Sequence, residues 1–336
     1  MKTALFRTYT LSLISCMLFL ASMPALGEDY DPLTISSQVK HSTMDMTVHD
    51  KMKSREIPIR VYLPAVASSS PVILYSHGLG GSREGSSYLG EHWASRGYTV
   101  VYLQHPGSDT SVWKNIPEWR RLKRLKAMKS AGNAQNFLLR VKDVTAVLNQ
   151  LEIWNKTESH GLEGRLNLKK VGMSGHSFGA RTTQAVCGQK FEGEYTQFTE
   201  ERIIAALPMS PSSPSDGTAK DAFGKVSVPW MLMTGTKDTA PFGNNSDAKS
   251  RLAVFPALPL GGKYELVLFE AEHSAFTDQA LMRRSEPRNP NHHRSILALS
   301  TAFWDTYLRE DNAAKDWLHG EGPRSVLEMR DVWQKK

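Results

Sequence analysis

The sequence predicts an α/β fold with a mostly parallel central sheet and helices on both faces. Three observations lead to this class. Apolar segments of strand length alternate with longer helical segments, which is typical of a parallel sheet. Residues 71–75 are continuously apolar, as expected of a strand buried on both faces. A glycine-rich turn at residues 175–179 separates a strand from a helix, and ligands bind at such loops in parallel sheets.

The first 27 residues have the composition of a secretory signal peptide. Two basic residues precede an apolar run at residues 11–21, and residues 25–27 form a small-x-small cleavage site. The apolar run is short for a membrane span. A lipoprotein signal with the lipid on Cys16 is the second interpretation, but apolar residues follow that cysteine. We therefore expect an exported protein, periplasmic or extracellular, that begins near Glu28.

Residues 28–336 are expected to form a single α/β domain, because no internal repeat or long linker divides them. Of the two cysteines in the chain, only Cys187 follows the signal peptide. One thiol cannot form an internal disulfide, so packing is its expected role. The sequence contains no H-E-x-x-H pattern and no cysteine cluster. We therefore expect neither a metal nor another cofactor.

Strand and helix signals follow one another from residue 36 onward. Residues 36–49 and 56–64 are predicted to pair as two antiparallel edge strands. Further strands are expected at residues 71–75, 98–103, 169–173, 203–207, 229–233 and 264–269. Helices are expected at residues 88–96, 134–151 and 178–187, with a final helix at 294–309. The loops at the carboxyl ends of the parallel strands should then carry the ligand site.

Residues 175–179, Gly-His-Ser-Phe-Gly, have the G-x-S-x-G pattern of a nucleophile elbow. In such an elbow the serine stands on a strained strand-to-helix turn, and the glycines let helix and strand approach each other. The free N–H groups at the helix start favour negative charge beside the serine. A glycine-rich structural turn is the alternative interpretation. The flanking strand and helix favour the elbow, with Ser177 as the nucleophile.

A serine nucleophile needs a neighbouring base, and the base needs an acid that orients it. In this architecture the order along the chain is serine, acid, histidine. Among the histidines after Ser177, only His273 directly follows a predicted strand, so it is the predicted general base. Asp238 follows a strand and a glycine turn and is the predicted acid. Asp216, in the Ser/Pro-rich loop after the preceding strand, is the runner-up.

Two backbone N–H groups are predicted to bind the oxyanion of a tetrahedral intermediate. One belongs to Phe178, directly after the nucleophile, and the other to Leu79, in the glycine-rich loop after residues 71–75. His77 and His176 adjoin these two positions. We expect both histidines to brace their loops rather than to catalyse.

Four segments now stand in order: His77-Gly-Leu-Gly-Gly-Ser82, His105-Pro-Gly-Ser-Asp109, Gly175-His-Ser-Phe-Gly179 and His273. Together they resemble the α/β-hydrolase superfamily, from residue 71 to the final helix. Within it, the chain is similar to bacterial predicted dienelactone hydrolases and to platelet-activating factor acetylhydrolases. The H-G-L-G loop, the G-H-S-F-G elbow and Arg140-x-x-Asp143 carry this likeness.

The resemblance implies an α/β-hydrolase fold and ester hydrolysis, with two departures. Dienelactone hydrolases use a cysteine where this chain has Ser177. Platelet-activating factor acetylhydrolases place the acid just after the strand that follows the elbow, where this chain reads Leu207-Pro-Met-Ser210. The acid is therefore expected to have shifted to Asp238, as in bacterial cutinases and polyester hydrolases.

Residues 110–132 read as a basic insertion in a chain with a net charge of +7. Residues 113–129 contain seven Lys and Arg but a single acid, Glu118. Trp119, Leu122 and Leu125 recur every third residue, as on a helix with an apolar stripe. One interpretation is a solvated insertion packed on the domain. Another is contact with an anionic surface, a lipid headgroup or an anionic substrate. Nucleic acid is not expected, because no binding motif accompanies the charge.

The sequence thus predicts a secreted serine hydrolase that cleaves carboxylic esters of small molecules or lipids through an acyl-enzyme. Two alternatives stay open. A serine peptidase or amidase would need the same three side chains, although no additional substrate-gating domain is evident in the sequence. An exported binding protein with an inactive hydrolase fold belongs to a different class, and the complete Ser, Asp and His set argues against it.

Overall fold

A computed structural model describes residues 30–35, 40–50, 54–65, 68–192, 198–240, 247–278 and 288–336. The expected signal peptide, residues 1–27, and its cleavage site lie outside these ranges. Asp31–Lys336 form one compact unit.

Among the described residues, nine strands form one sheet in the order β1-β2-β4-β3-β5-β6-β7-β8-β9. Neighbouring strands from β4 to β8 run parallel, whereas β1, β2 and β9 pair antiparallel. The strands are His41–Asp50 (β1), Arg55–Pro64 (β2), Ser70–Ser76 (β3), Thr99–Leu103 (β4), Leu166–His176 (β5), Ile203–Met209 (β6), Trp230–Lys237 (β7), Lys263–Glu272 (β8) and Val332–Lys335 (β9). The predicted mostly parallel sheet is confirmed.

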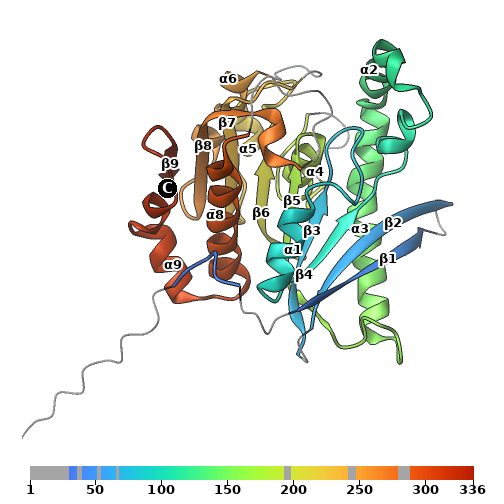
Figure 1. Cartoon of the computed structure of the whole chain (residues 1–336), viewed down its shortest axis with the longest axis horizontal. Coiled ribbons are helices and arrows are strands. Elements are labelled where there is room, and N and C mark those ends of the chain that lie inside the picture. Colours follow the sequence, from blue (N-terminus) through green and yellow to red (C-terminus); the bar gives the residue numbers. More distant parts are fainter. Residues whose placement is uncertain are drawn as a thin grey trace, which may run out of the picture. The chain divides into compact units, whose positions relative to one another are not determined.

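Helices cover both faces of this sheet (Figure 1). On one face α1 contacts α8, and on the other α3 contacts α4. The helices are Ser87–Ser95 (α1), Arg121–Ala131 (α2), Ala134–Lys156 (α3), Phe178–Val186 (α4), Ala219–Phe223 (α5), Ala248–Arg251 (α6), Val254–Ala257 (α7), Pro290–Leu308 (α8) and Asn312–His319 (α9). None of the helices in the described ranges is both long and apolar enough to cross a membrane.

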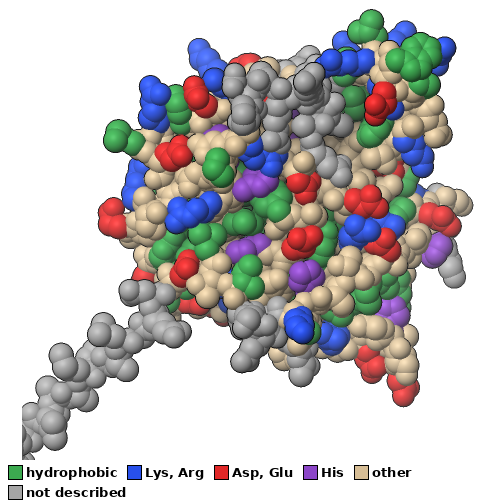
Figure 2. Space-filling view, viewed as in Figure 1, with side chains coloured by type: hydrophobic (Ala, Val, Ile, Leu, Met, Phe, Trp, Pro, Cys, Tyr) green, Lys and Arg blue, Asp and Glu red, His purple; other side chains and the backbone are tan. Residues whose placement is uncertain are grey.

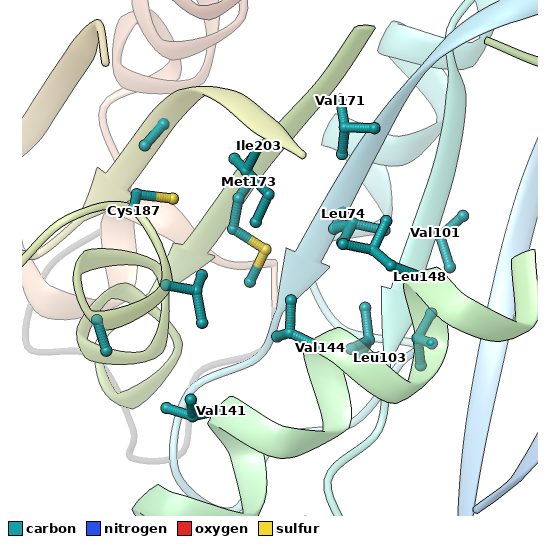
Figure 3. Packing of buried hydrophobic residues seen from close by; sticks show 14 of the residues in the cluster. Leu74, Val101, Leu103, Val141, Val144, Leu148, Val171, Met173, Cys187 and Ile203 are labelled. Atoms are coloured by element: carbon teal, nitrogen blue, oxygen red, sulfur yellow. The ribbon is translucent and has the colours of Figure 1, made fainter. Parts of the chain in front are cut away.

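The long helix α3 shows how the sheet is held rigid. Its apolar side chains Val141, Val144 and Leu148 recur at helical spacing and point at the strands, toward residues such as Leu74 and Val101 (Figure 3). All five are buried, and burying one such side chain contributes about 1.5–3 kcal/mol to folding. The packing of α3 against the sheet therefore fixes the strands whose carboxyl ends carry the candidate site.

At the edges of the sheet the structure differs from two sequence-based expectations. The predicted antiparallel pair is present as β1 and β2, although residues 36–39 lie outside the described ranges and β2 also pairs with β4. The helix predicted to be final, now α8, is not the last element, so that prediction was wrong. Helix α9 follows it, and β9 adds to β8 at the far edge. Strand β9 has only four residues and shows no alternating apolar pattern, which explains why the sequence did not reveal it.

Cys187, the single cysteine after the expected signal peptide, is buried and unbonded at the end of α4. The indole N–H of Trp230 donates to the Cys187 carbonyl over 3.2 Å. Burial raises the pKa of the Cys187 thiol well above its usual value, so the thiol stays protonated and poorly reactive. Its predicted packing role is confirmed.

Candidate active site

Ser177 lies between the end of β5 and the start of α4, in a backbone conformation that few non-glycine residues adopt. Its φ is 58°, and its N–H donates to the carbonyl of Met209 on β6 over 3.0 Å. A Cβ on Gly175 would overlap the backbone of Gly179, and a Cβ on Gly179 would overlap the backbone of Ser76. Both glycines are therefore required for the close approach of β5, α4 and β3, as the elbow pattern predicts.

Three of the predicted side chains come together at the carboxyl edge of the sheet. Nε2 of His273 lies 2.9 Å from Oγ of Ser177, and its Nδ1 lies 2.7 Å from Oδ1 of Asp238. Asp238 follows β7, and His273 opens a 3-10 turn directly after β8. Asp238 is fully buried, whereas the His273 side chain keeps 18% of its surface exposed. An unbroken hydrogen-bond relay thus runs from a buried carboxylate to the serine at the elbow.

The runner-up acid, Asp216, is not part of this relay. It is exposed in the loop after β6, where the hydroxyl of Ser215 donates to its carboxylate over 2.9 Å. Together with Arg181, one turn into α4 from Ser177, it lines a cavity of about 200 Å³ beside the helix. Of the two alternatives that the sequence left, the structure places Asp238 against the histidine and Asp216 on the rim of this cavity.

A buried arginine that the sequence analysis did not single out also contacts the relay. The Nε of Arg251 donates to the backbone carbonyl of Asp238 over 2.8 Å and lies 3.1 Å from its Oδ1. Its Nη1 donates to the carbonyls of Ser210 and Pro211 over 2.9 and 3.0 Å. Arg251 therefore joins the ends of β6 and β7 beneath the site. No local pattern in the sequence marks it, because its partners come from other strands.

The charge state of Asp238 follows from these contacts. Burial by itself would raise its pKa, but the hydrogen bond and charge of His273 and the charge of Arg251 lower the pKa overall. The hydroxyl of Thr234 also donates to Oδ2 over 2.8 Å. Asp238 is therefore ionised at neutral pH and can hold the His273 ring in the tautomer whose Nε2 faces the serine.

The peptide between Gly78 and Leu79 has a defined orientation beside Ser177. Three groups lie around the Gly78 carbonyl oxygen at 2.7, 3.0 and 3.4 Å: Nδ1 of His77, the N–H of Gly81 and Nη2 of Arg140. No described peptide bond is cis, so the N–H of Leu79 points away from these groups. A Cβ placed on Gly78 would lie 3.5 Å from Cβ of Ser177. The predicted second oxyanion donor thus belongs to a peptide adjacent to the serine.

A network of buried charged side chains holds the loop after β3, which contains Gly78 and Leu79. Arg140 donates to the carbonyl of His77 over 2.7 Å and to the hydroxyl of Ser108 over 2.8 Å. Asp143 accepts from Nε of Arg55 over 2.6 Å and pairs with Nδ1 of His105 at 2.9 Å. Burial alone would raise the pKa of Asp143, but hydrogen bonds from His105 and Arg55 lower it overall. The residues Arg140 and Asp143, which the sequence linked only by resemblance, thus have a structural role here.

Both histidines expected to brace loops are buried. The Nε2 of His77 accepts from the backbone N–H of His105 over 3.1 Å, which fixes the loop on β3 against the loop on β4. The ring of His176 packs 4.5 Å from that of His273. Burial lowers the pKa of His77 and His176 well below the usual histidine value, so both stay neutral near pH 7. The expectation of a bracing role is confirmed for His77 and agrees with the packing of His176.

Within the described ranges, no group of three or more His, Cys, Asp or Glu side chains is placed to hold a metal ion. The arrangement can transfer a proton between Ser177 and His273, beside the backbone N–H groups of Leu79 and Phe178.

A mostly parallel sheet with a serine at the strand-to-helix elbow defines an α/β hydrolase. The chain belongs to the family described as platelet-activating factor acetylhydrolase, isoform II, whose model matches residues 29–200. No curated protein matches the sequence. Membership of this family makes the chain a hydrolase of the esterase type. The matched range contains Ser177 and the Leu79 loop, whereas Asp238 and His273 lie beyond it.

Proposed function

We propose that this chain is a secreted serine hydrolase that cleaves carboxylic esters through an acyl-enzyme. The observation that carries the proposal is the relay from Asp238 through His273 to Ser177, with contacts of 2.7 and 2.9 Å. A serine with such a base and a buried orienting carboxylate is an activated nucleophile. Membership of an acetylhydrolase family supports an ester as the substrate.

In the first half of the reaction Oγ of Ser177 attacks the ester carbonyl carbon while its proton passes to Nε2 of His273. The carbonyl oxygen becomes an oxyanion, and the N–H groups of Leu79 and Phe178 stabilise it. Such donors contribute roughly 3–4 kcal/mol each to lowering the barrier. The carbon–oxygen bond to the alcohol then breaks, and His273 returns the proton to the leaving oxygen. Asp238 stays ionised throughout and stabilises the imidazolium.

In the second half a water molecule attacks the acyl carbon of the ester formed on Ser177, and its proton again passes to His273. The carboxylic acid leaves, and the serine regains its proton. Each half-reaction thus uses the same base and the same oxyanion donors, so one arrangement of side chains serves both.

The test of this proposal is turnover of a soluble ester. The wild-type chain should hydrolyse p-nitrophenyl acetate and react with a fluorophosphonate probe at Ser177. Ser177→Ala should lose both properties while circular dichroism shows an unchanged fold, because loss of the nucleophile removes most of the rate. Undiminished turnover in Ser177→Ala would contradict the proposal. A series of longer p-nitrophenyl esters would then define the preferred acyl length.

The same relay would also serve a serine peptidase or amidase, so that alternative is tested directly. A panel of peptide anilides should be cleaved poorly compared with the acetate ester. An inactive binding protein would neither turn over ester nor react with the probe. Export rests on the sequence of residues 1–27, and intact mass of the protein recovered from cells should give a chain that begins near Glu28. A lipid-modified Cys16 at its amino terminus would contradict soluble export.

A further inference from the structure

The basic insertion holds its apolar side chains outward. Trp119, in the 3-10 turn Glu118–Arg120, is 76% exposed, and Leu122, in the first turn of α2, is 83% exposed. The predicted apolar stripe of Trp119, Leu122 and Leu125 is therefore not packed on the domain as a whole. Of these three side chains only that of Leu125 is half-buried. Contiguous exposed apolar patches are typical of surfaces that bind a partner.

A different set of residues attaches the insertion to the domain. Met128 and Ala131 are buried on the inner side of α2. The indole N–H of Trp113 donates to the carbonyl of Gly80 over 2.7 Å, and Met128 packs against Gly80, its Sδ 2.7 Å from where a Cβ would stand. Since Gly80 directly follows Leu79, the insertion rests on the loop that carries the proposed oxyanion donor. The inner side of α2 is therefore anchored on a loop of the candidate active site.

The outward side combines the exposed apolar residues with lysines. Leu122, Lys126 and Lys129 are spaced at i, i+4 and i+7, so they form one stripe along the helix. We call Trp119, Leu122, Lys123, Lys126 and Lys129 the α2 face, and all five are exposed. Figure 2 shows hydrophobic and basic side chains next to one another at the end of the molecule where Figure 1 places α2.

Most of the positive charge around this face has no counter-charge among the residues that the structure describes. Arg124 is the exception, since it lies 3.7 Å from Glu118 and donates to the carbonyl of Ile116 over 2.6 Å. Among the described residues, no carboxylate forms an ion pair with the six other cations: Lys114, Arg120, Arg121, Lys123, Lys126 and Lys129. A partner with a dense negative surface would supply the missing counter-charge.

We propose that the α2 face docks the enzyme on an anionic phospholipid membrane. A Trp and a Leu among lysines match an interfacial helix, whose apolar side chains enter the headgroup region while the cations meet anionic lipids. Nucleic acid would satisfy the charges but would leave Leu122 without an apolar environment. The proposal goes beyond ester hydrolysis and does not depend on it, because docking can be measured without turnover.

The test is co-sedimentation of the full chain with vesicles of phosphatidylcholine alone or with about one-third phosphatidylserine. The wild type should bind the anionic vesicles, and added salt should weaken binding by screening. The combined variant Lys123→Gln, Lys126→Gln, Lys129→Gln should bind them roughly 100-fold more weakly, since each basic residue near such a surface contributes about fivefold. Trp119→Ala with Leu122→Ala should lose roughly tenfold or more.

A matched control removes the same charge elsewhere. Lys156→Gln, Lys169→Gln, Lys315→Gln changes three exposed lysines outside the insertion and should bind vesicles like the wild type. All variants share one amino terminus, so its contribution cancels. Hydrolysis of p-nitrophenyl acetate by the same samples reports separately on the proposed function. Docking would be overturned by equal binding to neutral and anionic vesicles, or by wild-type binding of the triple-lysine variant of the α2 face. An equal loss in the control variant would overturn it too, as would binding to duplex RNA without binding to vesicles.

Discussion

Ser177 and Ser210 stand at the ends of neighbouring strands with φ values of 58° and 57°. A left-handed backbone at a residue other than glycine costs roughly 1–3 kcal/mol, so two such residues side by side mark a strained edge of the sheet. Each is held by a neighbouring strand: Ser177 through the carbonyl of Met209, and Ser210 through the carbonyl of Met233. These two strained residues lie at the edge of the sheet where the side chains of Ser177, His273 and Asp238 meet.

The first prediction separates the two candidate acids. Asp238→Asn should lower kcat by up to about 10⁴-fold, because His273 loses the carboxylate that orients it and stabilises its charged form. Asp216→Asn removes a carboxylate that is exposed on the cavity rim, and should change substrate preference at most. Both are measured on one soluble ester, with circular dichroism as a check of folding. A crippled Asp216→Asn beside an active Asp238→Asn would reverse the assignment.

The second prediction concerns the charge beneath the relay. Nη2 of Arg251 lies 3.4 Å from Nδ1 of His273, and its charge helps to lower the pKa of Asp238. Removing that charge in Arg251→Met leaves the Asp238–His273 pair with a higher affinity for a proton. The acid limb of the pH profile of kcat/KM should therefore move to higher pH, in addition to any fall in kcat.

A control for this pH shift is Arg181→Met, which removes an arginine from the cavity wall rather than from the relay. Its acid limb should coincide with that of the wild type. A fall in kcat for Arg251→Met without any movement of the limb would mean that Arg251 only holds the loops together.

At the scale of elements, the loop after β3 depends on a buried arginine of α3. Arg140 is fully buried and reaches the carbonyls of both His77 and Gly78. Arg140→Lys keeps the charge but cannot reach several acceptors at once, so the Gly78–Leu79 peptide should lose part of its fixed orientation. We expect kcat to fall by about 10²–10³-fold with little change in KM, as for the loss of one oxyanion donor.

The matched control is Arg202→Lys, at a half-buried arginine that pairs with Glu200 and Glu152. This variant should keep its kcat. Steady-state kinetics on p-nitrophenyl acetate separates kcat from KM in both variants. A rise in KM alone for Arg140→Lys would indicate a role in substrate binding instead.

Local patterns were enough to predict the elements that form the centre of the sheet. A continuous apolar run marked β3 and a strand signal at residues 203–207 marked β6. Chain order and strand ends predicted the three residues that the relay joins. The outward orientation of Trp119 and Leu122 could not be read from a three-residue spacing, because which side of a helix is buried depends on the elements it meets. Arg251 was missed for the same reason, since its partners are distant in sequence.

At the scale of the whole molecule, buried neutral histidines make the fold less stable in acid. Burial lowers the pKa of His92 and His105 to about 4, and lowers the pKa of His77 and His176 well below the usual value. An unfolded chain binds protons at these histidines near pH 6.5, whereas the folded chain does not. Protonation therefore favours the unfolded state as the pH falls below 6.5.

The last prediction is a loss of stability between pH 6.5 and about 4. Each such histidine lowers the free energy of unfolding by up to about 1.4 kcal/mol per pH unit in this window, because the unfolded state alone takes up the proton. Urea unfolding of the wild type at several pH values should show this slope. His92→Gln removes one of the groups while its amide can still meet the hydroxyl of Thr301, the 3.1 Å neighbour of the imidazole. It should therefore flatten the slope even where it lowers stability at pH 7. An unchanged slope in His92→Gln would show that His92 takes up its proton in the folded protein as readily as in the unfolded chain.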